Sequence, residues 1–288
     1  MKQSVKKVLA LLLAMAMLIG FTACGKDEKS SAASGEESLA SSSASSKPFD
    51  NTLSEPESKP EEPVEAPELA GTVTEKSTAV NPDIVGYLQI PGTDIDEPVV
   101  QTYDNKTYMR LNYEGKYDFQ GSYWVDYECS VGDRTDMSRN TIIYGHNTAV
   151  TADDPNGLDF AQLLRFTDKK FAEEHPYIYF STGEEDMVWE VFAVFYTDLN
   201  FRYHTMIDSN ISTLISGAQE RSEFDYDVAV DASTDKVLTL STCTAKYGYR
   251  NGASLARFVV MARLVEQGAE LDNSVTVSVN TDKKTPNL

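Results

Sequence analysis

The chain has 288 residues, of which 41% are apolar and 24% are charged, as is ordinary for a globular protein. Its formal net charge of −20 argues against a nucleic-acid partner, because a phosphate-binding surface needs clustered Lys and Arg. The cysteines are Cys24, Cys129 and Cys243, and their spacing indicates neither a disulfide framework nor a zinc site. We therefore expect no metal site and no cofactor.

The N-terminus is typical of an export signal. Three lysines within the first seven residues precede an apolar stretch over residues 8–23. The stretch ends in FTACG, which resembles a bacterial lipobox, where the cysteine is lipidated and becomes the new N-terminus. The departure is Phe21, since lipoboxes usually carry an aliphatic residue there. Residues 1–24 are therefore expected to be a signal peptide ending at a lipidated Cys24, or else an uncleaved membrane anchor. Either one places the rest of the chain at the extracellular face of the membrane.

Residues 25–76 are rich in Ser, Glu, Ala and Pro, as in SSAASGEESLASSSASS and EPESKPEEPVEAPE. Large apolar residues are too sparse in this segment to bury a core, which predicts a disordered chain. Its prolines and like charges favour an extended form. We interpret the segment as a stalk that carries a folded domain away from the lipid, although a solvated tether with no further role fits the same composition.

The composition changes near residue 77, and β-rich runs separated by turn residues follow. A turn or helix start at residues 81–83 precedes the first run. The runs cover residues 84–90, 97–101, 122–126, 140–144, 177–180, 188–196, 236–242 and 258–265. Many short strands separated by turns predict a β-sandwich or barrel rather than alternating βα units.

Two segments have helical spacing. Residues 158–171 place Phe160, Leu163 and Leu164 on one face. Residues 208–221 carry a longer apolar stripe at i, i+3, i+4 and i+7, and Asp208 or Ser209 is the expected N-cap. Both helices are expected to pack on the sheet. The polar residues 268–288 predict a frayed C-terminal tail.

Cys243 is the candidate nucleophile. A lone cysteine in a strand is usually a small buried hydrophobic residue. Here, however, hydroxyl side chains surround the thiol, at Ser241, Thr242 and Thr244. Glycine and asparagine residues soon after it indicate a loop, so we expect the thiol at a strand end that solvent and substrate can reach. Cys129 has no such surroundings, and we interpret it as structural.

A thiol nucleophile needs a partner that exchanges protons with it, and the chain has three histidines. His146 follows the apolar run 141–144 and lies between a glycine and an asparagine, which predicts an imidazole at the rim of a sheet. His175 and His204 lie in polar surroundings typical of surface or packing residues. We therefore expect His146 to be the partner.

An arginine near the thiol completes the candidate site. A thiolate that attacks a carbonyl creates an oxyanion, and a guanidinium can donate hydrogen bonds to it without losing its own charge. Arg257 begins the run RFVV, Arg250 lies in the preceding segment, and Arg263 lies further into the run. We expect Arg257 to serve, provided that the loop 245–256 lets it reach Cys243.

Several motifs together resemble the class B sortases of Gram-positive bacteria. These are TLSTC followed by RFVV, IIYGHN upstream, and NPDIVGYLQIPGTDIDEPVVQ, GSYWVDY and HPYIYF in order between residues 80 and 266. The resemblance implies a mostly β fold. In that fold a closed barrel of about eight strands has an N-terminal helix and a helix inserted between two late strands. It places the catalytic domain at residues 77–267 and makes residues 208–221 the inserted helix.

Carried over by position, the resemblance implies Cys243 as the nucleophile, with His146 and Arg257 as its partners. Two features depart from the family. The loop before Arg257 is longer than in some relatives, so Arg250 stays open as a substitute, and sortases more often keep an uncleaved N-terminal helix than a lipobox. We expect residues 196–207 to line the substrate groove. The expected substrate contacts are Thr197, Ser241, Thr242 and Thr244.

The resemblance implies a transpeptidase that forms a thioester on Cys243 after a threonine in the C-terminal sorting signal of a secreted protein. The thioester is then resolved by an amine of a peptidoglycan crossbridge, a lipid-linked precursor or a pilin. Protonated His146 would favour the thiolate and protonate the departing amine. Two alternatives remain. One is a secreted cysteine peptidase that uses the same residues with water as the acceptor, and the other is a lipoprotein that binds peptides without turnover.

Overall fold

The computed structural model describes residues 64–148, 153–206 and 208–288. These residues belong to a single compact unit, Ser58–Leu288. The predicted export signal, Cys24 and the stalk up to residue 63 lie outside the described residues. Within the described ranges, every helix is too short or too polar to cross a bilayer.

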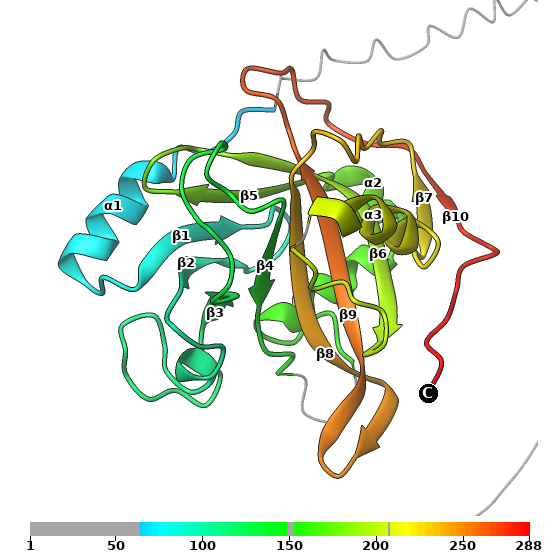
Figure 1. The fold of residues 1–288 in the computed structure, drawn as a ribbon, viewed down its shortest axis with the longest axis horizontal. Helices are drawn as coiled ribbons and strands as arrows, with labels where there is room; N and C mark the ends of the chain where they lie inside the picture. Colours follow the sequence, from blue (N-terminus) through cyan, green and yellow to red (C-terminus); the bar gives the residue numbers. More distant parts are fainter. Residues whose placement is uncertain (1–63, 149–152, 207) are drawn as a thin grey trace, which may run out of the picture. The chain divides into compact units, whose positions relative to one another are not determined.

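Eight strands close into a barrel in the order β1-β2-β3-β4-β8-β9-β6-β5 (Figure 1). Their bounds are β1 Ile84–Gln89, β2 Asp96–Val100, β3 Tyr123–Val125, β4 Asn140–Tyr144, β5 Tyr177–Thr182, β6 Val188–Asp198, β8 Val237–Arg250 and β9 Ala253–Leu264. Each strand overlaps one of the eight β-rich runs of the sequence. The predicted mostly β barrel is therefore confirmed.

The barrel interior is filled by large apolar side chains, among them Leu88, Ile142, Phe180 and Trp189, all of them fully buried. Most neighbouring strands are antiparallel, but β2 pairs with β3 and β4 pairs with β8 in parallel. A parallel pair brings the carboxyl ends of both strands to one edge of the sheet. The β4–β8 pair therefore sets the residues that follow Tyr144 beside those that follow Ser241.

Helix α1, Ala70–Ala79, packs on β1 and β5. Its start is fixed by Asp186, whose Oδ1 accepts hydrogen bonds from the backbone N–H groups of Leu69 (2.7 Å) and Ala70 (2.8 Å). Ordered structure thus reaches several residues to the N-terminal side of residue 77, where the sequence predicts that the domain begins. The predicted N-terminal helix is present.

The segment predicted as one helix over residues 158–171 is divided. A 3₁₀ helix, η2, covers Phe160–Thr167, and the short helix α2 covers Lys169–Glu174. Asp168 between them has an extended backbone, and its carboxylate accepts a hydrogen bond from the backbone N–H of Phe171 (2.9 Å). A residue with extended φ and ψ cannot continue a helix, so a capping aspartate ends one element and starts the next.

Helix α3, Ile211–Gln219, lies between β6 and β8 in the chain, as expected of the inserted helix, and buries its apolar stripe. The prediction that Asp208 or Ser209 caps it is wrong. Both residues belong to a 3₁₀ turn, η3, Asp208–Asn210, and the N-cap of α3 is Asn210, which makes no side-chain capping bond.

The C-terminal residues pack against the barrel. Strand β10, Val277–Val279, pairs with β7, Phe224–Tyr226, and Val277 is 2% exposed. Backbone hydrogen bonds from Val275 to the carbonyl of Glu173 (3.0 Å) and from Asn287 to Oδ2 of Asp198 (3.0 Å) hold the flanking residues. The predicted frayed tail is therefore wrong, because valines at alternate positions, Val275, Val277 and Val279, allow the polar stretch to pair with β7 and bury Val277.

The segment 245–256, predicted as a loop, is a β-hairpin that extends β8 and β9 beyond the barrel (Figure 1). Arg250 pairs with Ala253, so only Asn251 and Gly252 form the turn. Both have positive φ, 53° and 79°, as a two-residue type I′ turn requires. Asn-Gly between strand-forming residues is a strong hairpin signal, and it is the feature that sequence reasoning missed here.

Candidate active site

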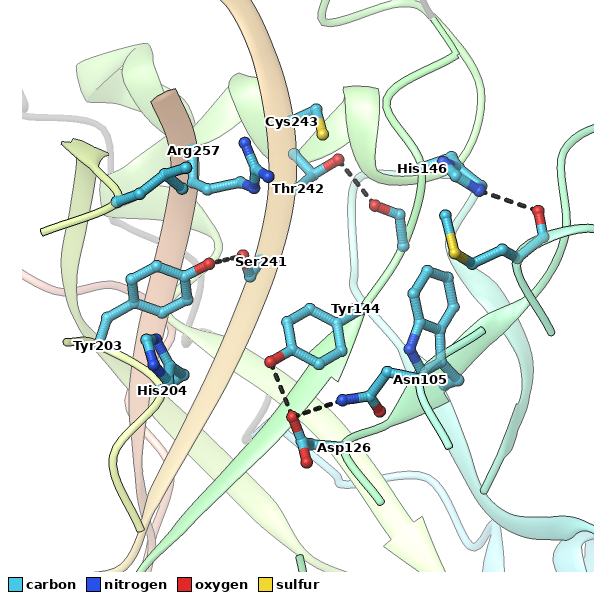
Figure 2. A pocket seen from close by; sticks show the side chains of 14 residues that line it. Asn105, Asp126, Tyr144, His146, Tyr203, His204, Ser241, Thr242, Cys243 and Arg257 are labelled. Atoms are coloured by element: carbon cyan, nitrogen blue, oxygen red, sulfur yellow. Dashed lines mark hydrogen bonds between the residues drawn. The ribbon is translucent and has the colours of Figure 1, made fainter. Parts of the chain in front are cut away.

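Strand pairing brings Cys243, His146 and Arg257 together. Tyr144 of β4 pairs in parallel with Ser241 of β8. One residue further along both segments, the Thr242 hydroxyl donates a hydrogen bond to the Gly145 carbonyl (2.8 Å), so the two segments stay side by side. His146 therefore leaves β4 at the level at which Cys243 lies on β8. On the other side, Cys243 pairs directly with Arg257 of β9. Figure 2 shows Cys243 between the guanidinium and the imidazole.

These three side chains line a cavity of about 530 Å³. Two of the predicted substrate contacts, Ser241 and Thr242, line it as well. Thr197 and Thr244 are fully buried and are not among the lining residues, so a contact of either with substrate stays a prediction. The remaining lining residues include His204, which sequence reasoning assigned to the surface or to packing.

The two described cysteines have different surroundings. Cys243 is partly exposed at the cavity, and its carbonyl accepts a hydrogen bond from the Asn147 side chain (3.0 Å). Cys129 is buried, and this burial raises the pKa of its thiol to about 12. Because a thiolate is the nucleophilic form, Cys129 is inert near neutral pH and acts as a packing residue.

His146 is held at its Nε2 atom. This nitrogen lies 3.1 Å from the carbonyl oxygen of Met109 and 3.2 Å from Nη1 of Arg110. Burial is the largest effect and lowers the pKa of His146. The hydrogen bond to the Met109 carbonyl raises it, the charge of Arg110 lowers it, the charge of Asp159 raises it, and the net result is a lowered pKa. The neutral imidazole is therefore favoured in the free site. The imidazolium expected from the sequence is correspondingly disfavoured in the free site.

Arg257 is oriented by its own strand. Its Nη1 donates hydrogen bonds to the carbonyls of Ala256 (3.0 Å) and Ser254 (3.3 Å), and its side chain lines the cavity (Figure 2). Arg250 lies at the end of the hairpin and lines a different hollow with Asp198 and Leu288. The structure therefore brings Arg257 to the thiol and leaves Arg250 away from it.

An aspartate that the sequence did not single out joins the two catalytic segments. The carboxylate of Asp153 accepts hydrogen bonds from the side chain of Asn147 (3.1 Å), the backbone N–H of Ala245 (2.7 Å) and the Thr244 hydroxyl. It thus ties the residues that follow His146 to those that follow Cys243. No pattern in the sequence indicates the contacts with Thr244 and Ala245, because these residues are 91 and 92 positions away from Asp153.

The wall opposite Arg257 is polar. Asp126 accepts hydrogen bonds from Tyr144 and from Asn105, both at 2.9 Å (Figure 2). Trp124 also lines the cavity, and its buried indole N–H has no partner among the described residues. Trp124 and Asp126 belong to the GSYWVDY motif, so the signal for this wall was present in the sequence.

Close carboxylates of the kind that bind a metal ion occur within the described ranges at Asp133, Asp136 and Glu184, none of which lines the cavity.

Comparison with known proteins identifies the family to which the chain is similar. The family model of the sortase domain matches residues 88–265. Sortase B of Listeria monocytogenes is 32% identical over 189 residues, which cover 65% of this chain and 71% of that protein. Sortase B of Staphylococcus aureus is 27% identical over 190 residues, covering 65% and 72%.

Solved structures resemble the fold as well. A Staphylococcus aureus sortase B–substrate complex has a TM-score of 0.58 at 25% identity, covering 68% of this chain and 85% of that one. Clostridium perfringens sortase B has a TM-score of 0.57 at 26% identity, covering 67% and 100%. With the domain match over residues 88–265, these likenesses show that the chain belongs to the sortase family as a class B sortase, a cysteine transpeptidase.

Proposed function

We propose that this transpeptidase works at the extracellular face of the membrane, where it cleaves the C-terminal sorting signal of secreted proteins after a threonine and transfers the acyl group to an envelope amine. The observation that carries the proposal is the position of Cys243 between His146 and Arg257 at the cavity. One of the similar structures is a Staphylococcus aureus sortase B–substrate complex, which supports binding of a sorting-signal substrate by this chain.

In the acylation step, the Cys243 thiol gives its proton to neutral His146, and the thiolate attacks the carbonyl carbon after the threonine. Arg257, held by the carbonyls of Ala256 and Ser254, donates hydrogen bonds to the oxyanion that forms. The carbon–nitrogen bond then breaks, and the proton on His146 moves to the departing amine. A thioester on Cys243 remains, and His146 is neutral again.

In the transfer step, an acceptor amine attacks the thioester while neutral His146 takes a proton from it. The new amide is released, and the Cys243 thiolate recovers that proton. The acceptor is an amine of a peptidoglycan crossbridge, a lipid-linked precursor or a pilin. The lowered pKa of His146 supports this role, because a general base must be neutral when the amine arrives.

The test uses the compact unit Ser58–Leu288 with a fluorogenic sorting peptide, with and without an amine acceptor. We expect an adduct between peptide and amine, lost in Cys243→Ala and kept in the matched control Cys129→Ala. Hydrolysis alone at high amine concentration would make the protein a peptidase instead. Peptide binding without acylation of Cys243 would make it a binding protein.

The membrane tether is tested on the full chain. Residues 1–63 are outside the described structure, so the proposal rests on the lysine-rich start, the apolar stretch and the FTACG sequence. We expect the protein in the membrane fraction and open to added trypsin from outside intact cells, with a lipid on Cys24. An unmodified Cys24 in a membrane-bound protein would indicate an uncleaved anchor, and a cytosolic protein would contradict both.

A further inference from the structure

Arg110 is an arginine next to the catalytic cavity that neither the motifs nor the proposed reaction uses. Its side chain is exposed, yet it is fixed at several points. Nη1 donates hydrogen bonds to the carbonyls of Met109 and Phe119, both at 2.9 Å, and the guanidinium lies 4.9 Å from the centroid of the Phe119 ring. A planar guanidinium that is already held by two carbonyls and a ring loses little further conformational entropy when it contacts another side chain.

The segment that carries Arg110 is also fixed. The backbone carbonyl of Arg110 accepts a hydrogen bond from Asp118 (3.0 Å), and that of Tyr108 accepts one from Ser122 (3.2 Å). Gly121, at φ 72°, passes so close that a Cβ there would lie 2.7 Å from the carbonyl oxygen of Tyr108 and 2.9 Å from that of Met109. The carbonyl of Met109 and the guanidinium of Arg110 therefore reach the cavity from one rigid turn.

Both groups meet the same atom, Nε2 of His146, at 3.1 and 3.2 Å. A single ring nitrogen cannot satisfy both at once. Both N–H groups of Arg110 Nη1 already donate to the carbonyls of Met109 and Phe119, so Nε2 keeps its proton and donates it to the Met109 carbonyl, which leaves Nδ1 as the nitrogen that exchanges protons. The Met109 carbonyl thus holds the Nε2–H group in both protonation states of the ring, and the ring keeps one orientation while Nδ1 exchanges its proton. The positive charge of Arg110, whose Nη1 lies 3.2 Å from Nε2, disfavours the imidazolium. The bond to Met109 lies on the far side of the ring from Cys243 (Figure 2).

We propose that Arg110 is a positioning residue for the transpeptidation, one that favours the neutral, correctly turned imidazole of His146 which the acceptor amine needs. The inference rests on the proposed role of His146 as the group that exchanges protons with Cys243 and the amine. It adds a residue outside the Cys243, His146 and Arg257 set.

Other charged and titratable groups also face His146, and a test must separate the effect of Arg110 on the His146 pKa from theirs. Asp159, from the start of η2, acts in the opposite direction to Arg110 and favours the imidazolium. Cys243 of β8 and Arg257 of β9 share the cavity, and the Trp124 ring of β3 packs against the imidazole with ring centroids 5.8 Å apart. Removing only the charge of Arg110 leaves burial as the remaining effect that lowers the pKa of His146, against the Met109 carbonyl and Asp159, so we expect that pKa to rise.

The experiment is an NMR titration of the histidine ring protons of the full chain in mild detergent, in a Cys243→Ala background so that the nucleophile does not titrate. Arg110→Gln is compared with Arg221→Gln. Arg221 is the matched control, since its guanidinium also lies over a ring, that of Phe201 at 4.0 Å, and donates to a backbone carbonyl, that of Gly217. We expect the pKa of His146 to rise in Arg110→Gln and to stay at the wild-type value in Arg221→Gln.

Arg110→Lys supplies a second variant that keeps the charge and loses the planar group. We expect its His146 pKa to lie between those of the wild type and Arg110→Gln. With Cys243 restored, kcat/KM for transpeptidation should fall about tenfold in Arg110→Gln and stay unchanged in Arg221→Gln. A His146 pKa that does not rise in Arg110→Gln, or that rises equally in the control, overturns the inference. Because the titration needs no substrate, failure of the proposed function would show separately, as a wild-type protein without transpeptidation.

Discussion

Arg257 and Cys243 face each other across two hydrogen-bonded strands, so their separation is set by the backbone of the sheet rather than by flexible side chains. The Arg257 guanidinium is turned by the carbonyls of Ala256 and Ser254, which leaves its other N–H groups for a ligand. A lysine at this position would keep the charge but could not donate in that fixed geometry.

We predict that Arg257→Lys lowers kcat/KM for transpeptidation by about 10²-fold, the cost of removing one oxyanion donor. The measurement is steady-state turnover of a sorting peptide with an amine acceptor. Arg250→Lys is the matched control, because Arg250 lies on the same hairpin but lines another hollow. A large loss in the control with near wild-type turnover in Arg257→Lys would move the role to Arg250.

The difference between the two cysteines gives a second prediction at the residue scale. Burial raises the pKa of Cys129 to about 12, so its thiol stays protonated, and stays unreactive, as the pH rises towards that value. Iodoacetamide at pH 8 should therefore modify Cys243 in the folded unit Ser58–Leu288 and leave Cys129 intact. Peptide mass spectrometry reads out both sites. Equal modification of the two without denaturant would contradict the assignment.

At the scale of elements, the site depends on the connection between two segments distant in the sequence. The parallel β4–β8 pair ends at Tyr144 and Ser241, and beyond it Asp153 joins the residue after His146 to the residues after Cys243. The strand ladder sets the level of the two catalytic side chains, whereas Asp153 sets how the chain continues on either side of them.

We predict that Asp153→Ala lowers kcat/KM about tenfold while the barrel stays folded, because the catalytic segments lose a shared anchor outside the core. Circular dichroism checks the fold, and peptide turnover checks the activity. Asp154→Ala is the matched control, since its exposed carboxylate accepts a local hydrogen bond from the backbone of Asn156 (2.9 Å). An equal loss in both variants would count against the anchor.

At the scale of the whole molecule, the first and last described segments pack against the barrel. Helix α1 covers β1 and β5, and β10 adds a strand to β7 beside α2 and α3 (Figure 1). Val277 of β10 belongs to the main hydrophobic core although it lies more than ten residues beyond β9.

We predict that ending the chain after residue 267 lowers the free energy of unfolding by at least about 2 kcal/mol, since Val277 is fully withdrawn from water and its neighbours would be exposed. The melting temperature should then fall by about 4–8 °C. A thermal melt of Ser58–Leu288 and of its shortened form provides the test. Asp282→Ala, at an exposed position of the same tail, is the control and should melt with the parent.

The sequence by itself determined the strands and the chemistry. Its eight β-rich runs became the eight barrel strands, because a short run of strand-forming residues bounded by turn residues is a local property that each run carries alone. The hydroxyl-rich surroundings of Cys243 and the Gly-His-Asn end of β4 indicated the nucleophile and its partner for the same reason. The division of residues 158–171 and the pairing of β10 were missed, since one turns on a capping aspartate and the other on a partner strand about fifty residues away.

Only the tertiary structure decided how the site is assembled. The register of β8 with β9 pairs Cys243 with Arg257 and leaves Arg250 near the end of the hairpin. The contacts of Asp153 with Ala245 and of Arg110 with His146 also join residues far apart in the chain. Spacing along a sequence carries no information about such contacts, because the closed barrel alone brings these segments to one edge.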